Sequence, residues 1–210
     1  MTMAPTLLTL VISMIVAQSD PIPAPTPPKP ADHPAPAPHA PTPIPATTAS
    51  ITDNGLTLTI PDGWTPEPVG AGAMGVIAAY RLPKAKGDAD DGAVRISHFP
   101  GMKGKDDMNI DRWIGQVKKP DGTPMKREDG KITKEEKGSI RLTILDISGN
   151  LSNSMSAGGG NGVPNQRLIA AIVDHPDGPH FVRVTGGNET IDKWEESVMA
   201  ALRGAQTDKK

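Results

Sequence analysis

The sequence predicts an α+β fold, with a mainly antiparallel sheet and helices on both faces of that sheet (an α/β/α sandwich). Short apolar runs are separated by clusters of glycine, proline, aspartate and asparagine, which is typical of strands joined by turns. Two further segments place apolar residues at helical spacing, one in mid-chain and one near the C-terminus. Some strand candidates are almost continuously apolar, and such strands are covered on both faces.

The predicted strands differ in how they are buried. Residues 56–60 alternate apolar and polar side chains, so they predict a strand with one buried face. Residues 76–80 and 168–173 are the nearly continuous apolar runs. The predicted strands are 56–60, 76–80, 93–99, 140–147, 168–173 and 181–185. Turn-forming residues gather at 86–92, 121–130, 149–165 and 174–179.

Two apolar stripes predict the helices. The first consists of Ile110, Trp113, Ile114 and Val117, with Asp107 or Asn109 as the N-cap and Pro120 as the stop. The second consists of Ile191, Trp194, Val198, Ala201 and Leu202, opened by Asn188 or Thr190 and closed at Gly204. Both tryptophans lie on these stripes, so we expect them to pack the helices against the sheet.

The chain is predicted to have three parts: a signal peptide at 1–18, a Pro/Ala-rich disordered linker at 19–50, and a single α+β domain at 51–210. Residues 7–16 form an apolar run that suits a signal peptide and is shorter than the roughly 20 residues that cross a bilayer. Small residues follow, so cleavage is expected near 17–19. No Lys or Arg precedes the run, so the alternative is an uncleaved segment that anchors the N-terminus in a membrane.

The linker is where the prolines concentrate. Of the 23 prolines in the 210 residues, 12 lie between Pro21 and Pro45. Such a tract favours extended polyproline II, which at about 3.1 Å per residue holds a domain up to roughly 90 Å from its attachment point. We therefore predict an exported protein, periplasmic or secreted, whose domain sits on a tether.

Composition excludes several classes of function. The chain has no Cys, which excludes disulfide scaffolds, Cys-ligated zinc, thiol catalysis and a lipid anchor on Cys. It carries 22 basic and 24 acidic residues, a net charge of −2, and the two signs are interleaved. Nucleic-acid binders concentrate basic residues on one face, so we expect no nucleic-acid partner.

Several short motifs resemble the beginning of PsbP-like and DcrB-like domains, as in uncharacterised exported bacterial proteins. The motifs are Ile-Pro-Asp-Gly-Trp at 60–64, Tyr-Arg-Leu-Pro at 80–83, Asn-Ile-Asp-Arg-Trp at 109–113, and Trp-Ile-Gly-Gln with Pro-Asp-Gly at 113–116 and 120–122. The resemblance covers most of residues 51–205. It implies an antiparallel sheet with helices on both faces and a binding or assembly-support role without a known active site.

The glycine-rich segment 149–162 is the first candidate for a binding site. It has neither the Gly-Lys-Ser/Thr ending of a P-loop nor a Gly-x-Gly-x-x-Gly pattern at a strand–helix junction. It is long for a hairpin connection, and long loops are often functional. The candidate partner-binding residues are Asn150, Asn153, Met155 and Asn161.

A cluster of metal-ligand residue types lies at 174–180. His175, Asp177 and His180 are the candidate ligands, and His98 is on the strand parity that reaches the core. The Pro-Asp-Gly-Pro sequence within the cluster also favours a turn that connects two strands. We follow the turn interpretation and predict no metal, no cofactor and no catalytic residue, since motifs for an activated nucleophile are absent from the sequence.

Two functions are therefore weighed. The first is an exported, non-catalytic domain that binds a protein or cell-envelope partner, with membrane contact only if the N-terminal segment is uncleaved. The alternative is a metal-dependent or hydrolytic enzyme that uses His175, Asp177 and His180. Convergence of those side chains with His98 would favour the alternative.

Overall fold

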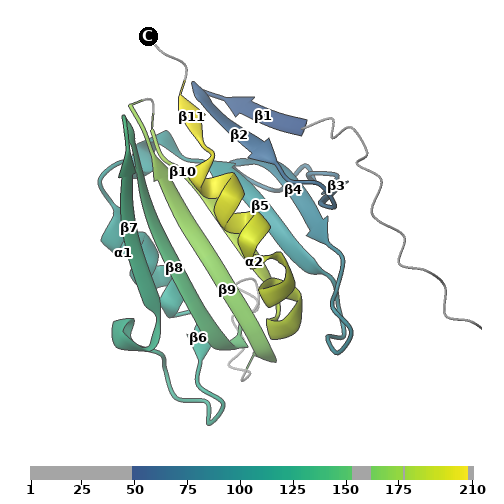
Figure 1. Ribbon diagram of the computed structural model, residues 1–210. Helices are drawn as coiled ribbons and strands as arrows, with labels where there is room; N and C mark the ends of the chain where they lie inside the picture. The colour runs from purple at the N-terminus through teal and green to yellow at the C-terminus, as the bar shows by residue number, and fades with distance from the viewer. Residues whose placement is uncertain (1–48, 153–161, 177, 208–210) are drawn as a thin grey trace, which may run out of the picture. The chain divides into compact units, whose positions relative to one another are not determined.

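The computed structural model describes residues 49–152, 162–176 and 178–207, which form two antiparallel sheets and two α-helices (Figure 1). The larger sheet has the order β3-β4-β5-β10-β9-β8-β6, and β7 also pairs with β8. Its strands are β3 (Thr65–Glu67), β4 (Val76–Leu82), β5 (Gly92–His98), β6 (Val117–Lys118), β7 (Lys131–Lys137), β8 (Ile140–Leu151), β9 (Val163–Asp174) and β10 (His180–Gly187). The smaller sheet is β1 (Ala49–Asp53), β2 (Leu56–Ile60) and β11 (Gln206–Thr207), in the order β1-β2-β11. The helices are α1 (Asp106–Ile114) and α2 (Asn188–Arg203).

Strand β9 shows how the core is divided. Its residues from Leu168 to Val173 are all buried, as the continuous apolar run predicts. Alternate residues starting at Leu168 belong to an apolar cluster that contains the buried residues of α1. Alternate residues starting at Ile169 belong to a second cluster, which contains the buried residues of α2 and of β2. Because successive side chains of a strand point to opposite sides, one central strand contributes to two cores.

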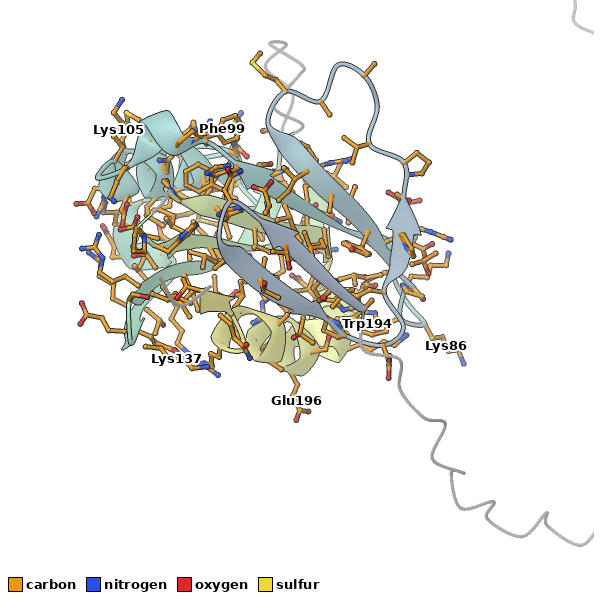
Figure 2. The ribbon with its side chains drawn as sticks, turned by 90° about the horizontal axis from the view of Figure 1, so that it is seen from above. Lys86, Phe99, Lys105, Lys137, Trp194 and Glu196 are labelled. Carbon is orange, nitrogen blue, oxygen red and sulfur yellow. The ribbon has the colours of Figure 1, made fainter. Side chains whose placement is uncertain are left out.

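Helix α2 follows the predicted stripe closely. It begins at Asn188 with Gly187 as the N-cap, so the predicted cap at Asn188 or Thr190 is wrong, and it ends before Gly204 as predicted. Ile191 and Val198 are fully buried. Figure 1 shows it running along β9 and β10. In Figure 2, Trp194 and Glu196 lie along α2 on one side of the fold, and Glu196 points away from it. The amphipathic pattern therefore identified the buried face correctly.

Helix α1 is shorter than predicted. It begins at Asp106 with Lys105 as the N-cap, so the predicted cap at Asp107 or Asn109 is wrong. Asn109 is instead buried, and its side-chain amide donates to the Lys105 carbonyl. The helix ends at Ile114. Val117 belongs to β6, where it pairs with Leu151 of β8. The apolar spacing continued past the end of the helix because the following strand buries the same cluster.

The sheet also differs from the prediction at its edges. Residues 76–80 were expected to be covered on both sides, but in β4 only Ala79 and Leu82 are buried. Strands β1, β3, β6, β7 and β11 were not predicted, and β1 begins at Ala49, just before the expected start of the domain at 51. Strand β7 consists largely of exposed charged residues, a composition that protects an edge strand from pairing with other chains.

Candidate metal centre

The turn between β1 and β2 positions an acidic side chain at the larger sheet. Asn54 and Gly55 both have positive φ, 43° and 80°, which is the backbone of a tight hairpin turn that Asn-Gly favours. Asp53 is the last residue of β1 and pairs with Leu56 across the turn. The turn therefore carries the Asp53 and Asn54 side chains to the ends of β5 and β10.

Two histidines meet Asp53 there. His98 at the end of β5 and His180 at the start of β10 are direct partners in the sheet register. Cross-strand partners project to the same side, and the two rings stack with centroids 4.3 Å apart and planes 6° apart. His98 thus has the core-facing parity that the sequence predicts. His180 is almost completely buried and the His98 side chain is 10% exposed.

One carboxylate oxygen lies between the two rings. Asp53 Oδ2 is 2.9 Å from His180 Nε2 and 3.2 Å from His98 Nδ1. The Asn54 side-chain amide donates to the same oxygen at 2.8 Å and lies 2.9 Å from His98 Nδ1. Among the described residues, one ligand atom each from Asp53, His98 and His180 lie within 4.8 Å of one another, which is close enough to hold one metal ion.

His175 supports His180 from the other side. Its Nε2 is 3.1 Å from His180 Nδ1, and the two ring centroids are 5.1 Å apart. Because the Asp53 carboxylate can only accept, a neutral His180 carries its proton on Nε2 and accepts from His175 at Nδ1. The chain of contacts runs from the buried His175 through His180 to the partly exposed Asp53, whose side chain is 27% exposed.

The electrostatics of the cluster favour neutral His180 and ionised Asp53. Burial lowers the pKa of His180, and the charges of His98 and His175 lower it further. The hydrogen bond with Asp53 raises this pKa but does not outweigh them. Burial acts to raise the pKa of Asp53, but hydrogen bonds from Asn54 and His180 outweigh it, so this pKa lies below its ordinary value. These are the protonation states in which both groups can ligate a metal.

Close backbone packing completes the site. Gly178 has φ +116°, and a Cβ at this position would lie 3.3 Å from His98 Nε2. That nitrogen is buried and has no hydrogen-bond partner among the described residues. At Gly178 the backbone before β10 therefore passes close to the His98 ring.

The predicted site residues are distributed unevenly. The structure brings His175 and His180 together with His98. These are three of the four side chains whose convergence would favour the metal-dependent or hydrolytic enzyme. Asp177 lies outside the described residues, and so do Asn153, Met155 and Asn161 of the candidate loop. Asn150 is buried within β8, where it pairs with Lys118.

Asp53 was missed by the sequence analysis. It is 127 residues from His180, and nothing in the local pattern links the two. The available signal was the Asp-Asn-Gly sequence between two alternating segments, which marks a hairpin turn and thus a strand end where side chains can gather.

The acidic turn at 86–92 has a structural role. Asp88 accepts a hydrogen bond from the Thr190 backbone N–H in the first turn of α2, at 2.6 Å. Asp91 accepts from the Lys84 backbone N–H and pairs with Arg81. Both aspartates thus lie in the segment 86–92, where the sequence predicts a turn, between the paired strands β4 and β5.

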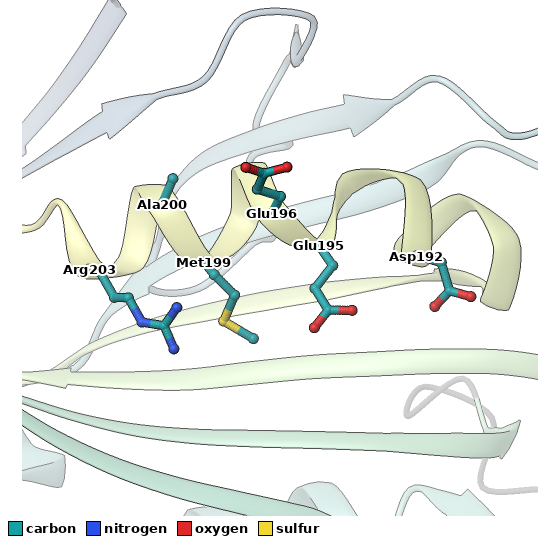
Figure 3. A pocket seen from close by; sticks show the side chains of 6 residues that line it. All are labelled: Asp192, Glu195, Glu196, Met199, Ala200 and Arg203. Carbon is teal, nitrogen blue, oxygen red and sulfur yellow. The ribbon is translucent and has the colours of Figure 1, made fainter.

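A surface hollow beside α2 is lined by charged groups that are already paired. Figure 3 shows its residues, which are Asp192, Glu195, Glu196, Met199, Ala200 and Arg203. Asp192 and Glu195 accept hydrogen bonds from Arg167, and Arg203 binds Glu135. These ion pairs fix α2 to β9 and β7, so the hollow offers few unpaired groups to a ligand.

Comparisons with known proteins bear on the fold. No family model matches the sequence, and no curated protein matches it. The solution structure of cyanobacterial PsbP (CyanoP) from Synechocystis sp. PCC 6803 matches with a TM-score of 0.50 and 13% identity, covering 82% of this chain and 100% of that one. A protein of unknown function from Pseudomonas aeruginosa matches with a TM-score of 0.45 and 10% identity, covering 79% and 100%.

The chain therefore has a PsbP-like α+β fold, and the resemblance seen in the short motifs is confirmed at the level of fold. Within the part of the chain that the structure describes, no helix is long and apolar enough to cross a membrane.

Proposed function

We propose that this protein is an exported binding domain that holds a divalent transition-metal ion between Asp53, His98 and His180. The observation that carries the proposal is the approach of three ligand atoms from three separate strands to within 4.8 Å of one another. Imidazole with one carboxylate is a ligand set that suits first-row ions such as Zn²⁺, Ni²⁺ and Cu²⁺.

The distances fit one shared ion. Two ligands of a tetrahedral zinc, each at about 2.0–2.2 Å from the metal, lie roughly 3.4 Å apart. The Asp53 oxygen is 2.9 Å from His180 Nε2 and 3.2 Å from His98 Nδ1, so small movements would open the space. Asn54, which contacts both Asp53 and His98, is on an exposed turn and can move aside.

His175 supplies the supporting contact that metal-bound histidines usually have. A ligating histidine commonly hydrogen-bonds through its second ring nitrogen, which sets the tautomer. Ligation through His180 Nε2 places the His180 proton on Nδ1, where His175 Nε2 lies 3.1 Å away to accept it. His175 is thus a positioning residue for the proposed ion.

Titration of the purified full chain with Zn²⁺, Ni²⁺, Cu²⁺ and Co²⁺ by calorimetry tests the proposal. We expect one ion per chain, and a Co²⁺ absorption spectrum typical of tetrahedral nitrogen and oxygen ligands. Asp53→Asn and His98→Ala should each weaken binding by at least about 100-fold, and His175→Gln by about 10-fold to 100-fold.

Two controls make the test specific. Asp62→Asn alters an exposed turn aspartate outside the cluster and should leave affinity unchanged. His33→Ala with His39→Ala removes the histidines of the proline tract, and tight binding should persist. Failure of all four ions to bind, or binding that survives both Asp53→Asn and His98→Ala, overturns the proposal.

A metal-dependent enzyme is the second candidate, and the number of ligands favours it. Three protein ligands leave a fourth position for water, as in catalytic zinc sites. The metal-loaded chain is to be assayed on ester, phosphodiester and peptide substrates. Turnover that needs the ion and disappears in Asp53→Asn would support this candidate, whereas metal binding without turnover would support a binding domain.

Export on a proline-rich tether is part of the proposal. It is supported by the apolar run at 7–16, the small residues after it and the proline tract that follows. Mass spectrometry of the protein from the exported fraction should give an N-terminus near residues 17–19. An intact N-terminus in the membrane fraction would instead support the anchored alternative.

A protein or cell-envelope partner remains part of the proposal as well. We also infer that α1 and α2 cover opposite faces of the sheet, since alternate residues of β9 belong to their two separate clusters. A pull-down that compares the full chain with a chain lacking 153–161 tests the candidate loop. Capture that needs those residues would assign the partner site to them.

A further inference from the structure

Two arginines, Arg95 and Arg112, lie near Arg183 on the side of the large sheet that packs with α1. Arg183 on β10 and Arg95 on β5 are direct partners in the register, so their side chains project to the same side. Phe181, two residues before Arg183, packs against Trp113 of α1, which identifies that side. Arg112, also on α1, is close enough for its charge to act on Arg183.

The hydrogen-bond partners of Arg183 and Arg112 are neutral. Arg183 donates through one terminal nitrogen to Gln116 Oε1 at 3.0 Å, and Arg112 donates to Asn109 Oδ1 at 3.1 Å. The Nε of Arg183 is buried and has no hydrogen-bond partner among the described residues. Within those same residues, no carboxylate pairs with Arg95, Arg112 or Arg183.

Other arginines of this protein show the usual arrangement. Arg167 donates to Asp146, Asp192 and Glu195, and Arg127 donates to Asp107 and Asp111. Arg183 departs from this pattern, because burial lowers its pKa and the charges of Arg95 and Arg112 lower it further. A partly buried cation beside two like charges costs stability unless an anion offsets it.

We propose that Arg95, Arg112 and Arg183 form a binding site for a tetrahedral oxyanion, either phosphate or sulfate or a phosphate group on a larger molecule. Guanidinium groups bind such oxyanions through paired N–H donors, and the free Nε of Arg183 supplies one of them. A doubly charged phosphate balances more of the three positive charges than a carboxylate does.

The site is separate from the proposed metal centre. His180 and Arg183 differ by an odd number of positions along β10, so their side chains project to opposite sides of the sheet. The two proposals therefore rest on different residues and can fail independently.

Titration of the full chain with inorganic phosphate, sulfate and acetate tests the proposal. The Arg Nε–H resonances are followed by NMR, and the Tm is measured at each concentration. We expect phosphate and sulfate to shift the Arg183 Nε–H signal and to raise the Tm, since a ligand that binds only the folded state stabilises it. Acetate should have a smaller effect.

Variants connect the effect to these residues. Arg95→Gln changes an exposed side chain and should weaken phosphate binding by about tenfold. Arg183→Met should abolish the phosphate-dependent rise in Tm, while its Tm without phosphate should equal or exceed that of the wild type because an unbalanced charge is gone. Arg127→Gln removes a neutralised arginine and should bind phosphate as the wild type does.

Vesicles distinguish the source of the phosphate group. Co-sedimentation with phosphatidylglycerol vesicles, compared with phosphatidylcholine vesicles, shows whether a lipid headgroup occupies the site. Binding that depends on Arg95 in either arm supports the proposal. It is overturned if phosphate leaves both the Arg183 signal and the Tm unchanged, or if Arg95→Gln and Arg183→Met bind phosphate like the wild type.

Discussion

Arg167 is largely buried, and its positive charge is paired with carboxylates. Its side chain is 12% exposed and binds both oxygens of Asp146, at 2.8 and 2.7 Å, with further contacts to Asp192 and Glu195. The guanidinium thus connects β9 with β8 and α2. Breaking such an arrangement from one side leaves charges without a partner, which costs more than the pairing itself contributes.

We expect Arg167→Leu to lower the free energy of unfolding by about 2 kcal/mol or more, because Asp146 stays largely buried without its partner. Urea unfolding at neutral pH measures the change. Arg127→Leu is the matched control: its ion pairs with Asp107 and Asp111 are exposed, so the effect should be clearly smaller. Equal effects of the two variants would contradict the assignment of Arg167 to a buried network.

At the scale of residues, the sequence predicts chemistry only where it is local. His175 and His180 lie close together in the chain, and the parity of His98 along its strand was enough to turn it towards them. Asp53 and Arg183 were not predicted as site residues, because their roles depend on neighbours from distant segments of the chain. The sequence shows which residue types are present, whereas strand pairing decides which of them meet.

The turn between β2 and β3 packs against Trp194 of α2. The Trp64 N–H points to the Pro61 carbonyl at 3.5 Å, and Gly63 between them has φ +85°. A β-turn with positive φ at its third residue favours glycine. Gly63 also lies under the ring of Trp194, and a Cβ there would be 2.6 Å from a ring carbon.

We expect Gly63→Ala to lower the free energy of unfolding by about 1–3 kcal/mol, because the backbone is strained and the Trp194 ring must move. Trp194 fluorescence and thermal unfolding measure the two consequences. In the control, Gly72→Ala, nothing lies within 4 Å of the new Cβ and φ is not positive, so stability should be unchanged or slightly higher. A stable Gly63→Ala variant with an unmoved Trp194 would contradict this reading of the turn.

At the scale of elements, periodicity identified the strongly patterned segments and missed the weak ones. The stripe of α2 is sustained over four turns, and its buried face and its end at Gly204 were predicted, whereas its N-cap is Gly187 rather than Asn188 or Thr190. The stripe of α1 merged with Val117, which is buried in the same cluster from a strand, so the helix was predicted too long. The short strands β3, β6 and β11 are set by their sheet neighbours, and a few residues carry no period of their own.

At the scale of the whole molecule, the large sheet is held together by the pairing of β5 with β10, two strands that lie far apart in the chain. Strand β10 pairs with β5 on one side and with β9 on the other, so the N-terminal strands β3, β4 and β5 join the rest through it. The sequence predicts an antiparallel sheet but not this order, because the pairing of β5 with β10 spans more than 80 residues. Local patterns carry no signal for it.

This topology predicts that a chain ending at Ser152 does not fold. It lacks β9, β10, α2 and β11, so β5 loses its neighbour β10 and β8 loses its neighbour β9. Both apolar clusters also lose the buried residues that these strands and α2 contribute. We expect no cooperative thermal transition and poorly dispersed amide signals in NMR, whereas a chain ending at Thr207 should unfold in one transition. If the paired strands β3, β4 and β5 formed an independent unit, the shorter chain would retain dispersed NMR signals from β4 and β5. That result would show that β10 joins two separately folding halves, rather than completing a single cooperative sheet.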